Sequence, residues 1–170
     1  MFIGLACPPK LFNMLNNFPR MKNQAFAHRN LPRLLLQARE SVMAHTRPGL
    51  RGHGLSDQQW RVLRVLGEAH ASGHAGVETG FIAREAFIIG PSLSGMLSRM
   101  ERDGLIERER DASDQRRTVV RATAKGLESV GTLSHTIEAH YRWMERRLGK
   151  DKLQQLYALL DEVIALDAEA

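Results

Sequence analysis

A helix predicted over residues 91–103 gathers small polar and basic side chains on one side. At 100° per residue, its apolar residues fall together on the opposite side. Serine hydroxyls and arginine guanidinium groups donate hydrogen bonds to phosphate oxygens and base edges, and a glycine permits close approach to a groove of DNA. The residues that we expect to make such contacts are Ser92, Ser94, Gly95, Ser98, Arg99 and Arg102.

An amphipathic helix with a solvated polar face is the alternative interpretation of this pattern. Serine and glycine are poorer helix formers than alanine, glutamate or lysine, which usually fill solvated helical faces. Their presence on the polar side of residues 91–103 therefore indicates that another molecule packs there.

A β-hairpin is predicted directly after this helix, because segments 105–110 and 116–121 alternate in character around a turn-forming stretch. A hairpin that follows a recognition helix is a wing, and a basic tip suits the narrow, electronegative minor groove. Arg116 and Arg117 supply basic side chains at the tip, and Asp114 is expected to orient Arg116 by a charge-assisted hydrogen bond. A surface hairpin with incidental ion pairs is the alternative.

The elements that must position these residues are short helices. Residues 31–50 have apolar side chains at helical spacing. Ser56 can cap the next helix, and Gln59 can reach back to complete a capping box. A short helix over about residues 78–86 is then joined to residues 91–103 by a tight, glycine-containing connection, which is typical of a helix–turn–helix.

Two long apolar stripes follow the hairpin. After a helix start at Thr123, apolar residues recur at spacings of three and four from Val130 to Leu148, and again from Leu153 to Val163. Together with the N-terminal helix, these stripes exceed what a small winged helix needs to cover its own core, so they predict a helical homodimer interface. An intramolecular helical layer is the alternative.

The predicted fold class is therefore mainly α with a small β-wing. It is a winged helix–turn–helix with flanking N- and C-terminal dimerisation helices. The expected domains are a poorly ordered extension over residues 1–22, an N-terminal dimerisation helix over 23–54, a winged helix–turn–helix DNA-binding domain over 55–122 and C-terminal dimerisation helices over 123–170.

Composition bounds the class of protein but does not place a binding surface. The net charge is +5, yet residues 1–53 hold eight Lys or Arg against one acidic residue, and the remaining chain is slightly acidic. The positive net charge of the whole chain therefore does not indicate a DNA-binding surface at residues 91–121. Cys7 is the single cysteine, which excludes an internal disulfide and fits a reducing cytoplasm. No apolar run approaches the roughly 20 residues of a membrane span, so no membrane association is expected.

Catalytic and metal-binding arrangements are not expected. The seven histidines are scattered, and neither a Ser-His-Asp set nor a pair of carboxylates is recognisable. His70 and His74 have a spacing that could bind a metal on a helix, but Gly73 lies between them and no cysteine or acidic partner is near. We therefore predict no enzyme activity, no cofactor and no metal.

The chain resembles the MarR family of bacterial transcription regulators over about residues 31–166. Members of this family pair a recognition helix ending in a Leu-Glu-x-x-Gly-Leu-like stretch with a wing that holds Asp-x-Arg. Here Met100-Glu101 and Gly104-Leu105 fit the first motif, and Asp114 with Arg116 fits the second. Two departures occur, at residues 79–83 and 121–123, and neither removes an expected DNA contact.

More narrowly, residues 34–40 and 58–61 are similar to the HpaR-type branch of the family. The resemblance implies a homodimeric repressor of homoprotocatechuate and 4-hydroxyphenylacetate breakdown, bound to a pseudo-palindromic double-stranded DNA operator. A small phenolic or aromatic carboxylate effector would release it from a site between the dimerisation helices and the DNA-binding lobe. A regulator answering to a different signal and a winged-helix protein-interaction module are the alternatives.

The candidate effector residues are Arg39 for a carboxylate, His45 for a phenol and Trp60 for ring packing. Each has a plainer interpretation. Arg39 could pair with a carboxylate of the chain itself, His45 could be solvated, and Trp60 could belong to the hydrophobic core.

Overall fold

The computed structural model describes residues 27–110 and 117–166, and the chain divides after Ala38 into two compact units. The described part of the first unit contains the beginning of helix α2 (Leu31–Gly52). Asn30 precedes this helix, and its side-chain oxygen accepts a hydrogen bond from the backbone N–H of Arg33 at 3.0 Å. This contact satisfies one of the amide groups left unpaired at a helix start.

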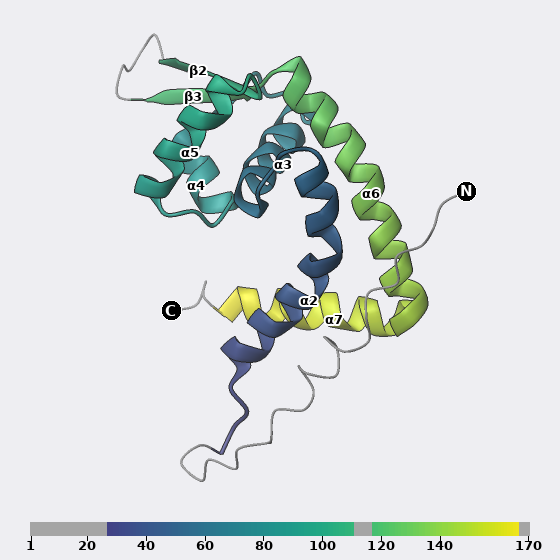
Figure 1. Ribbon diagram of the computed structural model, residues 1–170. Helices are drawn as coiled ribbons and strands as arrows, with labels where there is room; N and C mark the ends of the chain where they lie inside the picture. The colour runs from purple at the N-terminus through teal and green to yellow at the C-terminus, as the bar shows by residue number, and fades with distance from the viewer. Residues whose placement is uncertain (1–26, 111–116, 167–170) are drawn as a thin grey trace, which may run out of the picture. The chain divides into compact units, whose positions relative to one another are not determined.

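The second unit contains the rest of α2 and a three-stranded sheet among helices (Figure 1). The hairpin lies near the start of α6, and α7 follows the end of that long helix. This arrangement confirms the predicted winged helix–turn–helix with flanking helices. The elements are α3 (Asp57–Ala71), β1 (Val77–Glu78), α4 (Thr79–Glu85), α5 (Gly90–Arg102), β2 (Ile106–Arg110), β3 (Thr118–Ala122), α6 (Ala124–Leu148) and α7 (Lys150–Ala165).

Local hydrogen bonds set the helix starts where the sequence predicts them. Ser56 caps α3, and the reciprocal bond from its own N–H to the Gln59 side chain completes the capping box at 2.9 Å. Thr123 caps α6 by accepting from Gly126 N at 3.1 Å. Its hydroxyl also donates to the carbonyl oxygen of Gly104 at 2.7 Å, which ties the start of α6 to the end of α5. The capping bonds of Ser56 and Thr123 to backbone N–H groups involve only neighbouring residues, so they can be predicted from the sequence.

The sheet contains a strand that the sequence analysis missed. β1 pairs antiparallel with β3, on the side away from β2, with Val77 opposite Val120. The predicted short helix therefore begins at Thr79, after the strand. A Cβ on the preceding Gly76 would stand 2.7 Å from a methyl group of Val119, so only glycine allows β1 to approach this closely. Two residues are too few to show a strand periodicity.

The core lies between α3, α5, the sheet and the upper part of α6. Its fully buried side chains include Leu63, Leu93, Met100, Ile106, Val120 and Leu133. Leu133 and Ile137, from the first predicted C-terminal stripe, belong to this core. For them the intramolecular alternative is correct, because α6 covers the winged helix of its own chain.

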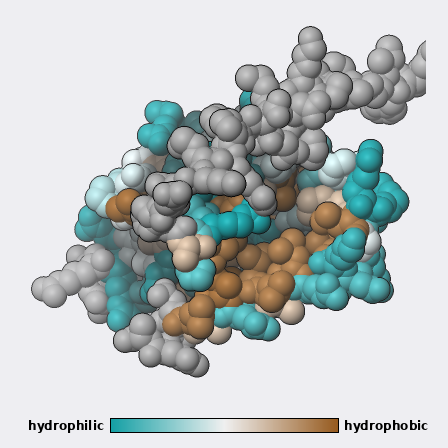
Figure 2. All heavy atoms as spheres, turned by 90° about the horizontal axis from the view of Figure 1, so that it is seen from below, coloured by the Kyte–Doolittle hydropathy of each residue, from teal (hydrophilic) through white to brown (hydrophobic). Residues whose placement is uncertain are grey.

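Helix α7 differs because most of its apolar side chains face solvent. Only Leu153 is buried, and Figure 2 shows an apolar band on the side of the molecule where α7 lies. A helix with this composition normally packs against another surface. The exposed large apolar residues of α7 and its C-terminal end are Leu156, Tyr157, Leu159, Val163, Ile164 and Leu166.

Candidate nucleic-acid interface

Helix α5 exposes the hydrogen-bonding face that its sequence predicts. Its four apolar residues, Leu93, Met96, Leu97 and Met100, are all buried. The six predicted contact residues, Ser92, Ser94, Gly95, Ser98, Arg99 and Arg102, are all exposed.

Among the residues that the structure describes, few contacts hold these exposed groups. Ser98 donates to the carbonyl oxygen of Ser94 at 3.2 Å, and Arg102 lies 3.7 Å from the Asp103 carboxylate. The nearest atom to a Cβ built on Gly95 would be a guanidinium nitrogen of Arg99, at 3.8 Å. The helix therefore offers an open surface of hydroxyl and guanidinium donors.

An ion pair joins the C-terminal turn of α5 to the first strand of the wing. Arg108 on β2 donates from Nε and Nη2 to one carboxylate oxygen of Glu101, at 2.9 and 2.5 Å. These hydrogen bonds from Arg108 lower the pKa of Glu101 below its ordinary value. The pair couples the orientation of the wing to that of the helix, and the sequence analysis assigned it no role.

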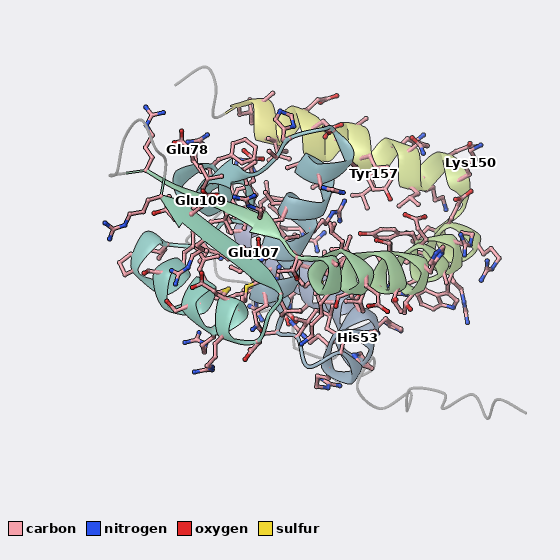
Figure 3. All side chains as sticks on the ribbon, turned by 90° about the horizontal axis from the view of Figure 1, so that it is seen from above. His53, Glu78, Glu107, Glu109, Lys150 and Tyr157 are labelled. Carbon is pink, nitrogen blue, oxygen red and sulfur yellow. The ribbon has the colours of Figure 1, made fainter. Side chains whose placement is uncertain are left out.

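The outer face of the sheet has alternating charges. Glu78 on β1 and Glu109 on β2 both lie opposite Val119 of the central strand. Glu109 pairs with Arg121, and Glu78 pairs with Arg117 at 2.9 Å. Figure 3 shows Glu107, Glu109 and Glu78 along this sheet. The pairs brace β3 from both neighbouring strands.

The predicted wing tip lies only partly within the described residues. Asp114 and Arg116 fall outside them. Arg117 is described directly before β3, where it forms an ion pair with Glu78. Its side chain is 57% exposed.

The structure does not place the three predicted effector residues around one hollow. Arg39 forms an ion pair with Glu40 at 2.7 Å and lies 4.0 Å from Asp57. Trp60 is buried in the core. His45 is exposed, but it stacks on His140 of α6 with ring centroids 4.9 Å apart. Burial and, to a lesser extent, the neighbouring His45 lower the pKa of His140.

A hollow between α3 and α6 does contain one of the three. It has a volume of about 250 Å³, and Trp60 lines it together with Arg64 of α3 and Tyr141 of α6. Arg64 donates to Glu68 at 2.8 Å, and this hydrogen bond raises the pKa of the guanidinium group, with a smaller contribution from Tyr141. An aromatic wall, a cation and a phenol hydroxyl thus line one hollow. Arg64 and Tyr141 were not singled out from the sequence, because their meeting depends on the packing of two distant helices.

Other kinds of site are not seen in the described ranges. Across residues 27–110 and 117–166, no group of three or more His, Cys, Asp or Glu side chains is placed to hold a metal ion. In the same ranges, no helix has the length and apolar character needed to cross a bilayer.

Helices α4 and α5 have the arrangement of a helix–turn–helix. The exposed face of hydrogen-bond donors on α5 and the hairpin beside it complete the arrangement of a winged helix–turn–helix DNA-binding protein. Comparison with known proteins narrows this class. Residues 53–117 match the MarR family. The chain is 40% identical over 139 residues to the homoprotocatechuate degradative operon repressor of Escherichia coli, covering 82% of this chain and 90% of that protein.

Solved structures agree with this assignment. The crystal structure of the transcriptional regulator PA4135 has a TM-score of 0.73 and 40% sequence identity, covering 80% of this chain and 96% of that one. The structure of NadR in complex with 4-hydroxyphenylacetate has a TM-score of 0.70 and 34% sequence identity, and the match covers 81% of this chain and 94% of that one. The chain therefore belongs to the MarR family, and it is a transcription regulator rather than an enzyme.

Proposed function

We propose that this regulator represses an operon for the breakdown of an aromatic acid and leaves its operator when a small phenolic acid binds. The observation that carries the proposal is the 40% identity to an aromatic-catabolism repressor over most of both chains. The open donor face of α5 supplies the DNA-binding surface that a repressor needs. Such a protein would act in the cytoplasm.

The proposed DNA contacts divide between the major and the minor groove. Ser94, Ser98 and Arg99 would reach base edges or phosphates in the major groove, with Ser92, Gly95 and Arg102 at the margins of the same face. Arg116, oriented by Asp114, would enter the minor groove, and the exposed part of Arg117 would reach a phosphate. Because these contacts are largely ionic, operator affinity should fall steeply as salt rises.

The proposed assembly is a homodimer that uses the apolar face of α7. A second copy offers the same face, so a two-fold axis would bury both at once. Two recognition helices related by this axis require a pseudo-palindromic operator, with half-site centres about 10 base pairs or a multiple apart.

The proposed effector site is the hollow between α3 and α6. A phenolic acid presents a ring, a carboxylate and a hydroxyl, and Trp60, Arg64 and Tyr141 offer a matching group to each. NadR, a structural relative, was crystallised with a ligand of this class. Arg39 and His45, the other predicted ligands, do not line this hollow, so we favour Arg64 as the partner of the carboxylate.

The test is fluorescence-anisotropy binding to DNA from the protein's own upstream region, at several salt concentrations. We expect tight, specific binding that 4-hydroxyphenylacetate or homoprotocatechuate releases. Arg116→Ala should lower operator affinity and reduce the salt slope by about 1, with the dimer intact. Arg64→Gln should keep operator binding but weaken release by the effector.

Three outcomes contradict parts of the proposal. Specific binding that neither compound affects would mean that the regulator answers to a different signal. Binding no stronger than to a random duplex would favour a protein-interaction module. Unchanged operator binding by Arg116→Ala would remove the assigned role of the wing.

A further inference from the structure

The turn that joins α4 to α5 exposes two large apolar side chains. Phe87 is 84% exposed and Ile89 is 79% exposed, whereas Ile88 between them is buried in the core. The turn is therefore anchored through its middle residue, and the side chains on both sides of it lie in solvent. They gain little from the hydrophobic effect in one chain alone, and an apolar pair of this kind is typical of a surface that contacts another molecule.

Ile89 occupies the N-cap of α5, a position that usually holds a hydrogen-bonding side chain. Its φ of −65° and ψ of 135° are the extended backbone of an N-cap, and its carbonyl oxygen accepts a hydrogen bond from the Leu93 N–H at 3.1 Å. Its side chain makes no capping bond to the N–H groups of the first helical turn. Serine, threonine, asparagine and aspartate stabilise a helix from this position, and isoleucine does not. The stability of α5 therefore does not explain an isoleucine here.

Gly90, the first residue of α5, is not required by packing within the chain. Its φ is not in the left-handed region, and a Cβ built on it would have no atom of the described residues within 4 Å. Glycine destabilises a helix relative to alanine because it loses more conformational freedom on folding. Its use at this position leaves the start of α5 open to close approach by another molecule.

The apolar turn is continuous with the proposed DNA-contacting face of α5. Pro91 and Ser92 follow Gly90 directly, and both are exposed. The N-terminal residues of a recognition helix are those that contact base edges in the major groove. A DNA duplex that Ser94 contacts is therefore also brought close to the residues at the start of the helix.

An isoleucine side chain can distinguish bases only by apolar contact, because it neither donates nor accepts a hydrogen bond. The C5-methyl group of thymine is the apolar group that base pairs present in the major groove. The amino and carbonyl groups of the other base edges would lose water against Ile89 without gaining a hydrogen bond, which is unfavourable.

We propose that Ile89 contacts a thymine in each half-site of the operator by packing against its C5-methyl group. The inference rests on the proposed function and deepens it, because it requires α5 to lie in the major groove. It adds an apolar, specificity-determining contact to the hydroxyl and guanidinium donors of the same helix.

The experiment compares two versions of the operator duplex from the protein's own upstream region. One is natural, and in the other every thymine is replaced by deoxyuridine, which removes the C5-methyl groups and keeps the Watson–Crick hydrogen bonds. The full-length wild type should bind the thymine operator about 15-fold more tightly, since one buried methyl group contributes about fourfold and the dimer has two half-sites. Fluorescence anisotropy measures both dissociation constants.

Ile89→Ser should remove this preference, because serine leaves no apolar side chain against the methyl group. We expect the variant to bind the thymine and deoxyuridine operators with about equal affinity. Ser98→Ala is the matched control, since it removes a hydroxyl group from the exposed face of the same helix. It should keep the wild-type ratio of the two affinities, whatever its effect on each.

Thermal unfolding separates a binding role of Ile89 from a structural one. Ile89→Ser supplies the N-cap hydrogen bond that wild type lacks, so its unfolding midpoint should stay the same or rise while the thymine preference is lost. A residue needed only to hold the turn would lower the midpoint on substitution.

Three results would overturn the inference while leaving the repressor assignment in place. They are equal affinity of wild type for the two operators, a thymine preference that persists in Ile89→Ser, and a preference lost in Phe87→Ala but kept in Ile89→Ser. The last would place the methyl contact on the neighbouring residue. Absence of specific binding to either operator would contradict the proposed function itself, so the two failures are distinguishable.

Discussion

At the scale of single residues, the ion pair of Glu101 and Arg108 joins the recognition helix α5 to the wing. Neither touches the exposed face of α5, yet both hydrogen bonds of the pair join that helix to the wing. The helix α5 positions its own exposed donors, and the Glu101–Arg108 pair is a contact from outside the hairpin that fixes the wing relative to this helix. We expect such an ion pair to affect DNA affinity by orienting the wing, without itself contacting DNA.

Glu101→Gln should therefore weaken the wing contacts to DNA while leaving the face of α5 intact. We expect the slope of log operator affinity against log salt to fall by about 1, the effect of losing one phosphate contact. Glu107→Gln, a nearby exposed carboxylate on β2, is the matched control and should bind operator with a steeper salt dependence than Glu101→Gln. Equal slopes in the two variants would contradict the assigned role.

The same pair has a defined pH dependence. The pKa of Glu101 is lowered in the folded protein, so its contribution to stability is fully present above the unfolded value of about 4.3. That contribution is lost as pH falls through the folded pKa. The difference in unfolding midpoint between wild type and Glu101→Gln should thus be constant from pH 7 to 5 and should shrink below about pH 4.

At the scale of elements, the start of α6 packs against the residues that directly follow α5. A Cβ on Gly126 would overlap the carbonyl oxygen of Leu105 and stand 3.4 Å from a methyl group of Leu63. The helix can therefore approach the hairpin only with glycine at this position. The capping bonds of Thr123 hold the same junction from the other side.

Gly126→Ala should destabilise the protein by about 1–3 kcal/mol, because the overlap must be relieved by moving backbone. The better helix propensity of alanine, at most about 1 kcal/mol, does not offset this cost. Gly131→Ala, on the same helix with nothing within 4 Å of its Cβ, should instead stabilise by about 0.5–1 kcal/mol. Chemical denaturation of both variants measures the contrast, and a neutral Gly126→Ala would show that α6 can shift freely.

At the scale of the whole molecule, the apolar surface of α7 decides the state of assembly. Ile164 is 70% exposed within one chain, so a substitution there does not disturb the core described above. In the proposed homodimer, the same side chain would be covered by the second copy.

Ile164→Lys should raise the dimer dissociation constant by about 100-fold or more, because an unpaired ammonium group would be buried in the interface. Analytical ultracentrifugation over a range of concentrations measures the effect. Gln155→Lys adds the same charge at an exposed polar residue of α7 and should leave the dimer intact. If both variants dimerise like wild type, the interface lies elsewhere.

The sequence by itself determined the features that depend on neighbouring residues. The buried and exposed faces of α5 follow from helical periodicity, and the caps at Ser56 and Thr123 need partners only three residues away. Family membership could be read in the same way, because its motifs are short and ordered along the chain.

Only the tertiary structure decided which distant side chains meet. The pairing of β1 with β3, the meeting of Arg64 and Tyr141 across α3 and α6, and the bond from Arg61 to Phe87 join residues far apart in the sequence. For the same reason, only the tertiary structure places Arg39 4.0 Å from the carboxylate of Asp57 and Trp60 in the core. Such contacts depend on how helices pack, and side-chain periodicity specifies which face is buried but not which residue it will touch.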